Sequence, residues 1–277
     1  MFENIVGHEK QKETLFKMVD SGNISHAYLF FGNKGIGKYT LAIEFAKKIL
    51  DVDNLGDCPD FKIIRKKEDK KDIVVEQIRK EIIDELYLAP ASSSRKVYII
   101  DDAELLNKAA QNALLKTLEE PPKYITIVLI ASNLSAFLST IVSRVNKVAF
   151  DGINDELLKK FIDTKYDVVL EDKVIEYLEG SIGKAVDVIE NNVLEELKKV
   201  DNLYSVIKEK DFIKAMKISG TINFSNQYLL DYLEYIIHKE DKHYCIKFVE
   251  NAKIRLNFNG NYDIIIDTML LRLIDSV

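Results

Sequence analysis

The segment Gly32–Tyr39, with the sequence Gly-Asn-Lys-Gly-Ile-Gly-Lys-Tyr, matches the phosphate-binding pattern GxxxxGK[ST] at every position except the last. Its glycines, Gly32, Gly35 and Gly37, permit the tight backbone that wraps phosphate groups. The Lys38 ammonium can reach the β- and γ-phosphate oxygens of a nucleotide. These residue types at this spacing predict a loop that binds ATP, with a glycine-rich turn that binds no ligand as the alternative.

The chain departs from the pattern at its last position. A Ser or Thr there supplies the hydroxyl that ligates Mg²⁺, and the Tyr39 phenol cannot take that geometry. Thr40 carries the next hydroxyl, but in a helix it points about 100° away from position 39, so it is a poor substitute. We therefore expect ATP binding to be weak or absent, and we expect no metal site.

A second chemical signal follows the apolar run Val97–Ile100, where Asp101 and Asp102 end a predicted buried strand. In nucleotide hydrolases an aspartate in the place of Asp101 orients the metal, and a glutamate at the next position orients the attacking water. Asp102 is one methylene shorter than glutamate, and a displacement of about 1 Å can slow a reaction about 10²-fold. We assign the pair to the degenerate nucleotide site, although both residues can also cap the helix that follows.

Two further polar residues lie beyond the next predicted strand. Asn133 is placed to contact a γ-phosphate or, alternatively, to serve as a turn residue where the strand ends. Arg144 follows Ser143 at the end of a predicted short helix. It is a candidate to stabilise negative charge on a phosphoryl group, in its own site or in a neighbour's. The alternative for Arg144 is a surface salt bridge.

Other residue clusters give weaker signals. Arg65–Lys71 is basic but interrupted by acids, which indicates a solvated loop, with a contact to the DNA backbone as the alternative. His26, beside the first predicted strand, is expected to pack in the core. Cys58 and Cys245 are far apart and form neither a zinc pattern nor a disulfide framework. No Ser-His-Asp or Cys-His arrangement can be argued from the sequence.

The elements that must position these residues alternate along the first half of the chain. The predicted strands are Ala27–Phe31, Phe61–Ile64, Lys96–Ile100, Ile125–Ile130 and Val148–Phe150, and the predicted helices are Lys38–Leu50, Val74–Leu86 and Ala103–Glu120. Strands that are almost continuously apolar and separated by helices imply a parallel sheet covered on both faces. The loop then joins a strand to a helix, so a bound phosphate would lie at the helix N-terminus.

The character of the chain changes after Gly152. Short helices are predicted at Asn154–Phe161, Lys173–Leu178 and Ala185–Leu197, and helical periodicity continues from Tyr204 to Val277. We therefore divide the chain into an α/β domain at 1–151, a small helical domain at 152–200 and an all-helical domain at 201–277. Residues 151–277 carry 17 Lys and Arg against 24 Asp and Glu, which argues against that half wrapping DNA by itself.

The bulk composition sets outer bounds on these assignments. The chain has 277 residues, of which 47% are hydrophobic and 30% charged, so we expect a soluble globular protein of two or three domains. No apolar run approaches about 20 residues, so we expect no membrane span. Met1–Asn4 lacks the basic and apolar regions that begin a secretory signal. A cytoplasmic location with no membrane partner is therefore the expectation.

Taken together, four segments of the chain resemble the AAA+ clamp-loader subunits of bacterial DNA polymerase III. In chain order they are Ser25–Gly32, the loop that ends at Lys38, Asn112–Pro122 and Ser143-Arg144. Asn112–Pro122 is the most specific single match. Ser143-Arg144 matches the first two residues of the family's Ser-Arg-Cys motif, with Val145 in place of the cysteine. The resemblance is strong over residues 1–150, moderate over 151–195 and weak after 200.

Within that family the departures resemble the delta-prime subunits, which form the stator of the loader and commonly carry degenerate sites. The gamma/tau motor subunits keep a full P-loop, an Asp-Glu pair and a zinc module with four cysteines. This chain has Tyr39 in the loop, Asp101-Asp102 as the acidic pair, and only Cys58 in the region of the zinc module. The resemblance therefore implies no zinc here. The place of a sensor arginine in the motors is taken by Gly183 or Lys184.

The resemblance also implies an architecture and a role. The fold would be a RecA-like AAA+ P-loop domain with a parallel sheet, a small helical lid domain and a C-terminal helical collar that joins a hetero-pentameric ring. The chain would act with gamma/tau and delta subunits to load the sliding clamp onto primed DNA, itself touching the clamp and the DNA only indirectly. Arg144 would be an arginine finger that completes a neighbouring ATP site in trans.

Besides an AAA+ adaptor with a different partner, two alternatives to the stator remain open at this point. One is an active gamma/tau-like ATPase motor in which Thr40 serves the metal. The other is a non-catalytic AAA+ scaffold that neither binds ATP nor supplies a finger. In each case the chain is a component of a DNA-directed DNA polymerase complex with no polymerase site of its own, and whether it is itself an enzyme is left open.

Overall fold

The computed structural model describes residues 5–258 and 260–277 of the chain. Residues 1–4, on which the expectation about a secretory signal depends, lie outside the described residues. The chain divides into two compact units, Met1–Gly183 and Lys184–Val277. The division into three domains expected above stays a prediction.

The first unit is built on a five-stranded sheet in the order β2-β3-β4-β1-β5, and every pairing between neighbouring strands is parallel. The strands are β1 (Ala27–Phe31), β2 (Phe61–Ile64), β3 (Lys96–Ile100), β4 (Ile125–Ala131) and β5 (Asn146–Ala149). The predicted parallel sheet is therefore confirmed. Because all strands run the same way, their carboxyl ends meet at one edge, which is where open α/β sheets bind ligands.

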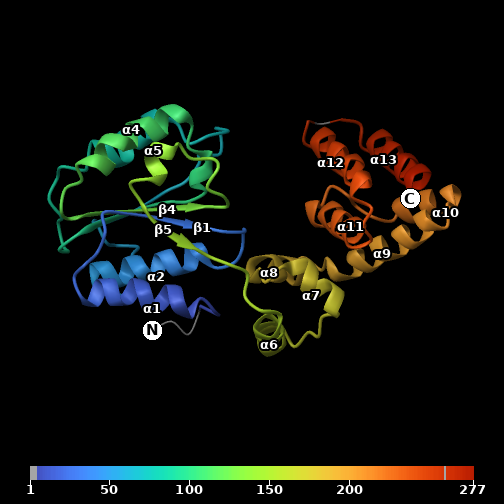
Figure 1. Cartoon of the computed structure of the whole chain (residues 1–277), viewed down its shortest axis with the longest axis horizontal. Helices are drawn as coiled ribbons and strands as arrows, with labels where there is room; N and C mark the ends of the chain where they lie inside the picture. The colour runs from blue at the N-terminus through green and yellow to red at the C-terminus, as the bar shows by residue number, and fades with distance from the viewer. Residues whose placement is uncertain (1–4, 259) are drawn as a thin grey trace. The chain divides into compact units, whose positions relative to one another are not determined.

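Alternate residues of the strands enter two separate cores, one on each face of the sheet. Tyr28 and Phe30 of β1 pack with Leu41 and Phe45 of α2 (Lys38–Leu50), while Leu29 belongs to the core on the other face. Figure 1 shows α1 (Glu9–Asp20) and α2 on one side of the sheet and α4 (Lys108–Glu119) and α5 (Ser139–Val142) on the other. The strands are apolar on both faces because both faces are covered.

Two of the predicted helices are interrupted. The helix expected over Ala103–Glu120 is instead a 3₁₀ turn, η2 (Ala103–Leu105), followed by α4 (Lys108–Glu119). Leu106 is extended, and the Asn107 side chain accepts a hydrogen bond from the Ala110 N–H at 2.8 Å, so the long helix begins there. The helix expected over Val74–Leu86 is a short α3 (Val75–Ile78) that continues into a π-helical turn, η1 (Arg79–Ile83).

The loop that leads into β3 is held by one buried carboxylate, Asp60. Its oxygens accept hydrogen bonds from the backbone N–H groups of Ala91, Ser92 and Ser93 at 2.7 to 2.8 Å, and from the Ser92 hydroxyl at 3.0 Å. Burial acts to raise the pKa of Asp60, but these donors outweigh it and hold the pKa below its usual value. The charged form therefore stabilises the fold.

We expect Asp60→Asn to lower the free energy of unfolding by about 2 kcal/mol at pH 7, because charge-assisted hydrogen bonds are lost. The folded-state pKa lies below the unfolded value, so the stabilisation is complete above about pH 4 and is lost as the pH falls through the folded pKa. Urea unfolding of the wild type and the variant between pH 3 and pH 7 measures this. Asp57→Asn, at a nearby exposed aspartate, is the control. A constant difference at all pH values would contradict the expectation.

A short helix, α5 (Ser139–Val142), lies between β4 and β5. After the sheet come α6 (Asp155–Tyr166) and α7 (Asp172–Leu178). The Asn154 side chain caps α6 by accepting a hydrogen bond from the Leu157 N–H at 2.8 Å. The helix expected over Ala185–Leu197 is two helices, α8 (Ile182–Glu190) and α9 (Leu194–Lys208). Asn192 between them has a φ of 54°, a left-handed conformation that a helix cannot contain.

The second unit is helical, as predicted. It comprises the part of α8 from Lys184 onward and all of α9, and then α10 (Phe212–Ser219), α11 (Gln227–Lys239), α12 (His243–Asn257) and α13 (Tyr262–Ser276). Within it α9 packs against α10, α11 and α13, and α12 packs against α11 and α13. Over the described parts of the chain, none of the helices is both long and apolar enough to cross a membrane.

Candidate nucleotide-binding site

The glycine-rich loop connects β1 to α2 and adopts a conformation that requires glycine. Gly32, Gly35 and Gly37 have φ values of 144°, 74° and 100°, a region that residues with a side chain rarely occupy. Gly37 is the residue that precedes α2, so the first N–H groups of that helix face the loop. The loop therefore has the backbone that phosphate binding needs.

Lys38 is buried beside this loop, with 6% of its surface exposed. Its ammonium donates hydrogen bonds to the carbonyl oxygens of Gly32 and Asn33, both at 2.6 Å. Burial lowers the pKa of Lys38, and the Glu104 and Asp102 carboxylates oppose that shift. The lysine is thus held by the loop at the place from which it could transfer its hydrogen bonds to a phosphate.

The acidic side of the site comes from β3 and the turn after it. Asp101 follows the last residue of β3, and Asp102 has a left-handed backbone with a φ of 47°. Glu104, in the next turn, accepts a hydrogen bond from the Ser132 N–H at 3.2 Å through one oxygen. Its other oxygen is buried without a hydrogen-bond partner. Three carboxylates therefore gather near the Lys38 ammonium.

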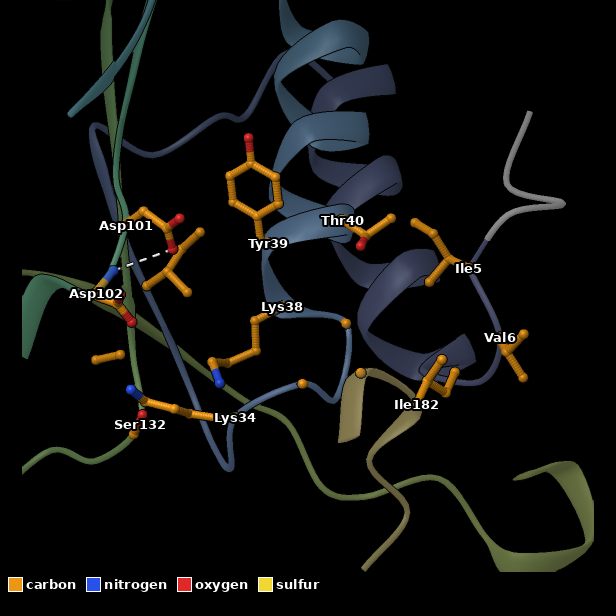
Figure 2. A pocket seen from close by; sticks show the side chains of 15 residues that line it. Ile5, Val6, Lys34, Lys38, Tyr39, Thr40, Asp101, Asp102, Ser132 and Ile182 are labelled. Carbon is orange, nitrogen blue, oxygen red and sulfur yellow. Dashed lines mark hydrogen bonds between the residues drawn. The ribbon is translucent and has the colours of Figure 1, made fainter. Parts of the chain in front are cut away.

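A cavity of about 450 Å³ lies between these groups. Six residues assigned to the nucleotide site line it, namely Gly35, Gly37, Lys38, Thr40, Asp101 and Asp102. Tyr39 and Lys34 line it as well. Figure 2 shows Tyr39 on the side of α2 that faces Asp101, whereas Thr40 lies on the other side of the helix. The volume of the cavity is typical of small-molecule sites.

Three of the assigned residues lie outside the described lining of the cavity. Gly32 follows the last residue of β1 and lies against the backbone of Phe150, which comes directly after β5. Asn133 uses its side-chain oxygen locally, accepting hydrogen bonds from the Ser135 hydroxyl at 2.8 Å and the Ala136 N–H at 3.2 Å. These are the contacts of a turn residue at a strand end, which was the alternative for Asn133.

Arg144 is the third assigned residue outside the lining of the cavity. It follows α5, and nearby residues hold its side chain. Its guanidinium donates to the carbonyl oxygen of Thr140 at 2.9 Å and forms an ion pair with Glu119 at 2.8 Å. Glu119 is the last residue of α4, and 34% of the Arg144 side chain is exposed. The arginine is therefore positioned at the surface by two helices.

The structure adds to the site Arg65, which the sequence analysis assigned only to a basic, solvated loop. The Arg65 side chain donates a hydrogen bond from Nε to Asp101 at 3.1 Å, and its guanidinium carbon lies 4.9 Å from the centre of the Tyr39 ring. The spacing of Arg65 and Asp101 in the sequence gives no sign of this contact. It follows from the register of the sheet, because Ile64 of β2 pairs with Ile100 of β3 and each polar residue comes next.

The start of α8 closes one side of the loop. The Ser181 hydroxyl donates to the carbonyl oxygen of Lys34 at 2.9 Å, and the Gly183 N–H donates to that of Gly35 at 2.7 Å. A Cβ atom at Gly183 would lie 2.8 Å from the Gly35 Cα, so a larger residue does not fit without movement. Gly183, proposed as one of two replacements for a sensor arginine, is thus in contact with the loop itself.

Among the described residues, no group of three or more His, Cys, Asp or Glu side chains could hold a metal ion. Cys58 is half-buried and Cys245 is buried, and both are free thiols.

Comparison with known proteins finds relatives among the subunits of DNA polymerase III. The family model described as DNA polymerase III, delta subunit, matches residues 7–154. The DNA polymerase III subunit gamma of Buchnera aphidicola subsp. Acyrthosiphon pisum (strain APS) is 30% identical over an alignment of 235 residues, which covers 76% of this chain and 64% of that protein. The DNA polymerase III subunit tau of Bacillus subtilis (strain 168) is 30% identical over an alignment of 240 residues, which covers 80% of this chain and 41% of that protein. The chain thus spans less than two thirds of either relative.

Solved structures agree on the fold. A DNA polymerase III gamma subunit-related protein from Thermotoga maritima superposes with a TM-score of 0.57, covering 96% of this chain and 99% of that one at 18% identity. A RuvB mutant from Thermotoga maritima gives a TM-score of 0.50, covering 99% and 89% of the two chains at 17% identity. At these identities the likeness concerns the fold, and it confirms the predicted RecA-like AAA+ architecture.

Proposed function

This chain belongs to the DNA polymerase III delta-subunit family, and we propose that within it the chain is a delta-prime-like stator of the replication clamp loader. In that role it assembles with gamma/tau and delta subunits in a hetero-pentameric ring and helps to load the sliding clamp onto primed DNA. It supplies Arg144 to a neighbour's ATP site rather than hydrolysing ATP itself. The relatives reported above are gamma and tau subunits, so the choice of the stator rests on the residues of the site.

The observation that carries the proposal is the hydrogen bond that Asp101 accepts from Arg65. This carboxylate stands where a motor subunit orients its metal, but here it accepts a hydrogen bond from Arg65 at 3.1 Å. Tyr39 replaces the other metal ligand and lies beneath the same guanidinium. Asp101 is thus engaged in an ion pair and position 39 carries no metal-ligating hydroxyl, so we infer that the site does not activate water as a motor site does. Arg144, by contrast, keeps the Ser-Arg context expected of a finger.

The second candidate is the gamma/tau-like motor, and one observation favours it. Thr40 lines the cavity, so a hydroxyl is present near the loop. Against it, Thr40 lies on the side of α2 away from Asp101, so the two cannot easily share one metal (Figure 2).

Hydrolysis by the purified chain separates the two candidates. We expect the chain alone, given ATP and Mg²⁺, to release phosphate no faster than its Lys38→Ala variant, because neither metal ligand of a motor site is available. Phosphate release measured with a coupled assay over a range of chain concentrations provides the test. Turnover that rises with concentration and disappears in Lys38→Ala would establish the motor and overturn the stator.

A further inference from the structure

The second unit ends in two helices that lie side by side, α12 and α13 (Figure 1). They run antiparallel, because the Tyr244 hydroxyl near the start of α12 donates a hydrogen bond to the Ser276 carbonyl at the end of α13. One side of the pair packs against α9, α10 and α11. The surface that these contacts leave exposed is the α12–α13 face, which includes Tyr244, Arg255, Phe258, Ile264, Leu271 and Arg272.

Large apolar side chains are exposed on the α12–α13 face. Phe258 is 80% exposed and Ile264 57%. Isolated apolar residues are common on protein surfaces, but a contiguous patch marks an interaction site. Along α12 one stripe recurs at intervals of four and three residues, namely Tyr244, Phe248, Asn251, Arg255 and Phe258. This is the spacing of one side of a helix, and it is not the side that carries the buried Cys245, Val249 and Ala252. Helix α12 therefore has one side for the core and a second that is suited to a partner.

A groove runs between the two helices on this face. Phe248 of α12 and Met269 of α13 line a cavity of about 180 Å³, together with Arg255 and Arg272. Small-molecule sites have volumes of about 300 to 1,000 Å³, so this cavity is too small for one. It suits a side chain that a partner inserts between the helices, as in the packing of knobs into holes.

The two arginines are placed differently from the lysines of this unit. Arg255 and Arg272 are the only arginines in the sequence from residue 184 to residue 277, and both are exposed. Within the described part of the unit neither forms an ion pair, whereas five lysines do, namely Lys198, Lys199, Lys208, Lys214 and Lys253. Arginine is enriched at protein interfaces, and its planar guanidinium can bind a carboxylate through two hydrogen bonds. Carboxylates of a partner can therefore complete two groups that the unit itself leaves unpaired.

We propose that the α12–α13 face binds an acidic amphipathic helix of a partner protein. Carboxylates of that helix pair with Arg255 and Arg272, and its apolar side chains enter the groove and cover Ile264 and Leu271. This binding lies beyond the proposed function, because it concerns a surface of the second unit and does not depend on whether the chain is a stator or a motor.

The spacing of the two arginines defines the pattern of the partner helix. Arg272 lies level with Phe248, since its guanidinium carbon is 5.9 Å from the centre of that ring. Arg255 comes seven residues after Phe248, which is about 10.5 Å further along α12. A helix that lies along the groove meets both arginines when it carries two carboxylates about seven residues apart, with apolar residues between them. The stripe from Tyr244 to Phe258 is about 21 Å long, so about 14 residues of helix cover it.

Charge disfavours two other occupants of the same face. Residues 184–277 carry 13 Lys and Arg against 15 Asp and Glu, so the unit lacks the excess of positive charge that DNA binding requires. A second copy of this chain would bring the same two arginines to the interface, where like charges repel. An acidic helix instead brings the opposite charge to both arginines.

Fluorescence anisotropy of a labelled synthetic peptide, titrated with the purified full chain, tests the proposal. The peptide is a helix of about 15 residues with leucines along one side and, beside them, two glutamates about seven residues apart. We expect saturable binding with a Kd of about 10 μM, and about tenfold weaker binding when both glutamates are replaced by glutamine. Equal affinity for the two peptides would overturn the proposal. So would a lack of saturable binding up to about 200 μM chain.

Variants of the chain locate the binding. The double variant Arg255→Gln, Arg272→Gln should bind the glutamate peptide about tenfold more weakly than the wild type does, but the glutamine peptide almost equally well, because both changes remove the same charge pairs. Leu271→Ser, at an exposed apolar residue, should weaken both peptides about threefold. Lys217→Gln, at an exposed lysine of α10, is the matched control and should leave binding unchanged. A double variant that keeps the preference for glutamate would overturn the proposal.

Two further measurements test the other occupants. Sedimentation over a range of concentrations reports self-association of the chain, and anisotropy of a labelled DNA duplex reports nucleic-acid binding. Self-association that Leu271→Ser abolishes, or DNA binding that the arginine double variant abolishes, would overturn the proposal. The comparison of the two peptides on the wild type needs no variant, so it stands even where a variant fails to fold. A negative result would leave the stator role untouched, because that role is tested through Arg144 in the assembled ring.

Discussion

Replacing Arg144 by alanine is expected to slow ATP hydrolysis at the neighbouring subunit's site about 10³-fold, with the ring still assembled. A finger supplied in trans neutralises charge that develops on the transferred phosphoryl group. Removing the finger therefore slows the chemical step of hydrolysis. Arg144 is suited to this role because it stands at the surface after α5 with its side chain ordered by Thr140 and Glu119. The measurement is DNA-stimulated hydrolysis per assembled ring, with assembly checked by size exclusion.

The ion pair between Arg144 and Glu119 supplies the control. If alanine at 144 acted only by removing a surface ion pair, Glu119→Gln would reproduce its effect, since it breaks the same 2.8 Å contact. We expect Glu119→Gln to leave most hydrolysis in place, because exposed pairs contribute little to stability. Arg144→Lys, which keeps the charge but not the planar donors, should be intermediate. Hydrolysis unchanged in Arg144→Ala would instead support the non-catalytic scaffold.

The second large effect concerns the fold around the loop. Gly32→Ala is expected to destabilise the first unit by about 3 kcal/mol or more. A Cβ atom at this position would lie 2.1 Å from the carbonyl oxygen of Phe150 and 3.0 Å from the Ile36 side chain, and the φ of 144° is unfavourable for alanine. The backbone of Phe150 cannot move freely because its N–H donates to the Phe31 carbonyl at 2.8 Å. Urea unfolding followed by far-UV circular dichroism measures the loss.

Gly22→Ala is the matched control for Gly32→Ala. Gly22 also has a positive φ, of 70°, but nothing lies within 4 Å of a Cβ atom built there. Its cost should be confined to the left-handed backbone, about 1 kcal/mol. Equal losses in the two variants would show that backbone conformation alone accounts for Gly32. A larger loss at Gly32 would identify the residue as a packing requirement where β1 leaves the sheet.

The sequence was most informative where the signal is local. Ala27–Phe31, Phe61–Ile64 and Lys96–Ile100 were each predicted as strands with the bounds that the structure has. Helix α2 likewise runs from Lys38 to Leu50 as predicted. Apolar runs and glycine positions report on a few adjacent residues, and these elements depend on little else.

Some predictions were wrong because a sequence pattern reports only on residues close together in the chain. The helix expected over Ala103–Glu120 has the right period, yet Asn107 caps α4 and Leu106 is extended. The backbone at Ile73 explains why: its N–H and carbonyl bond to Leu105 and Asn107, which draws this segment toward the start of α3. A contact between segments more than thirty residues apart overrode the helical preference, and periodicity carries no information about such a contact.

By itself the sequence predicted a glycine-rich loop between a strand and a helix, with Tyr39 where the pattern has a metal-ligating hydroxyl, and it predicted the parallel sheet that supports the loop. The tertiary structure alone decided which side chains meet around the loop. Arg65 and Asp101 meet because β2 and β3 end in register, and Ser181 and Gly183 reach the loop only through the folding of the intervening chain. Residue types and spacing define what one segment can do. Strand register and packing decide which segments meet, because they depend on the whole core at once.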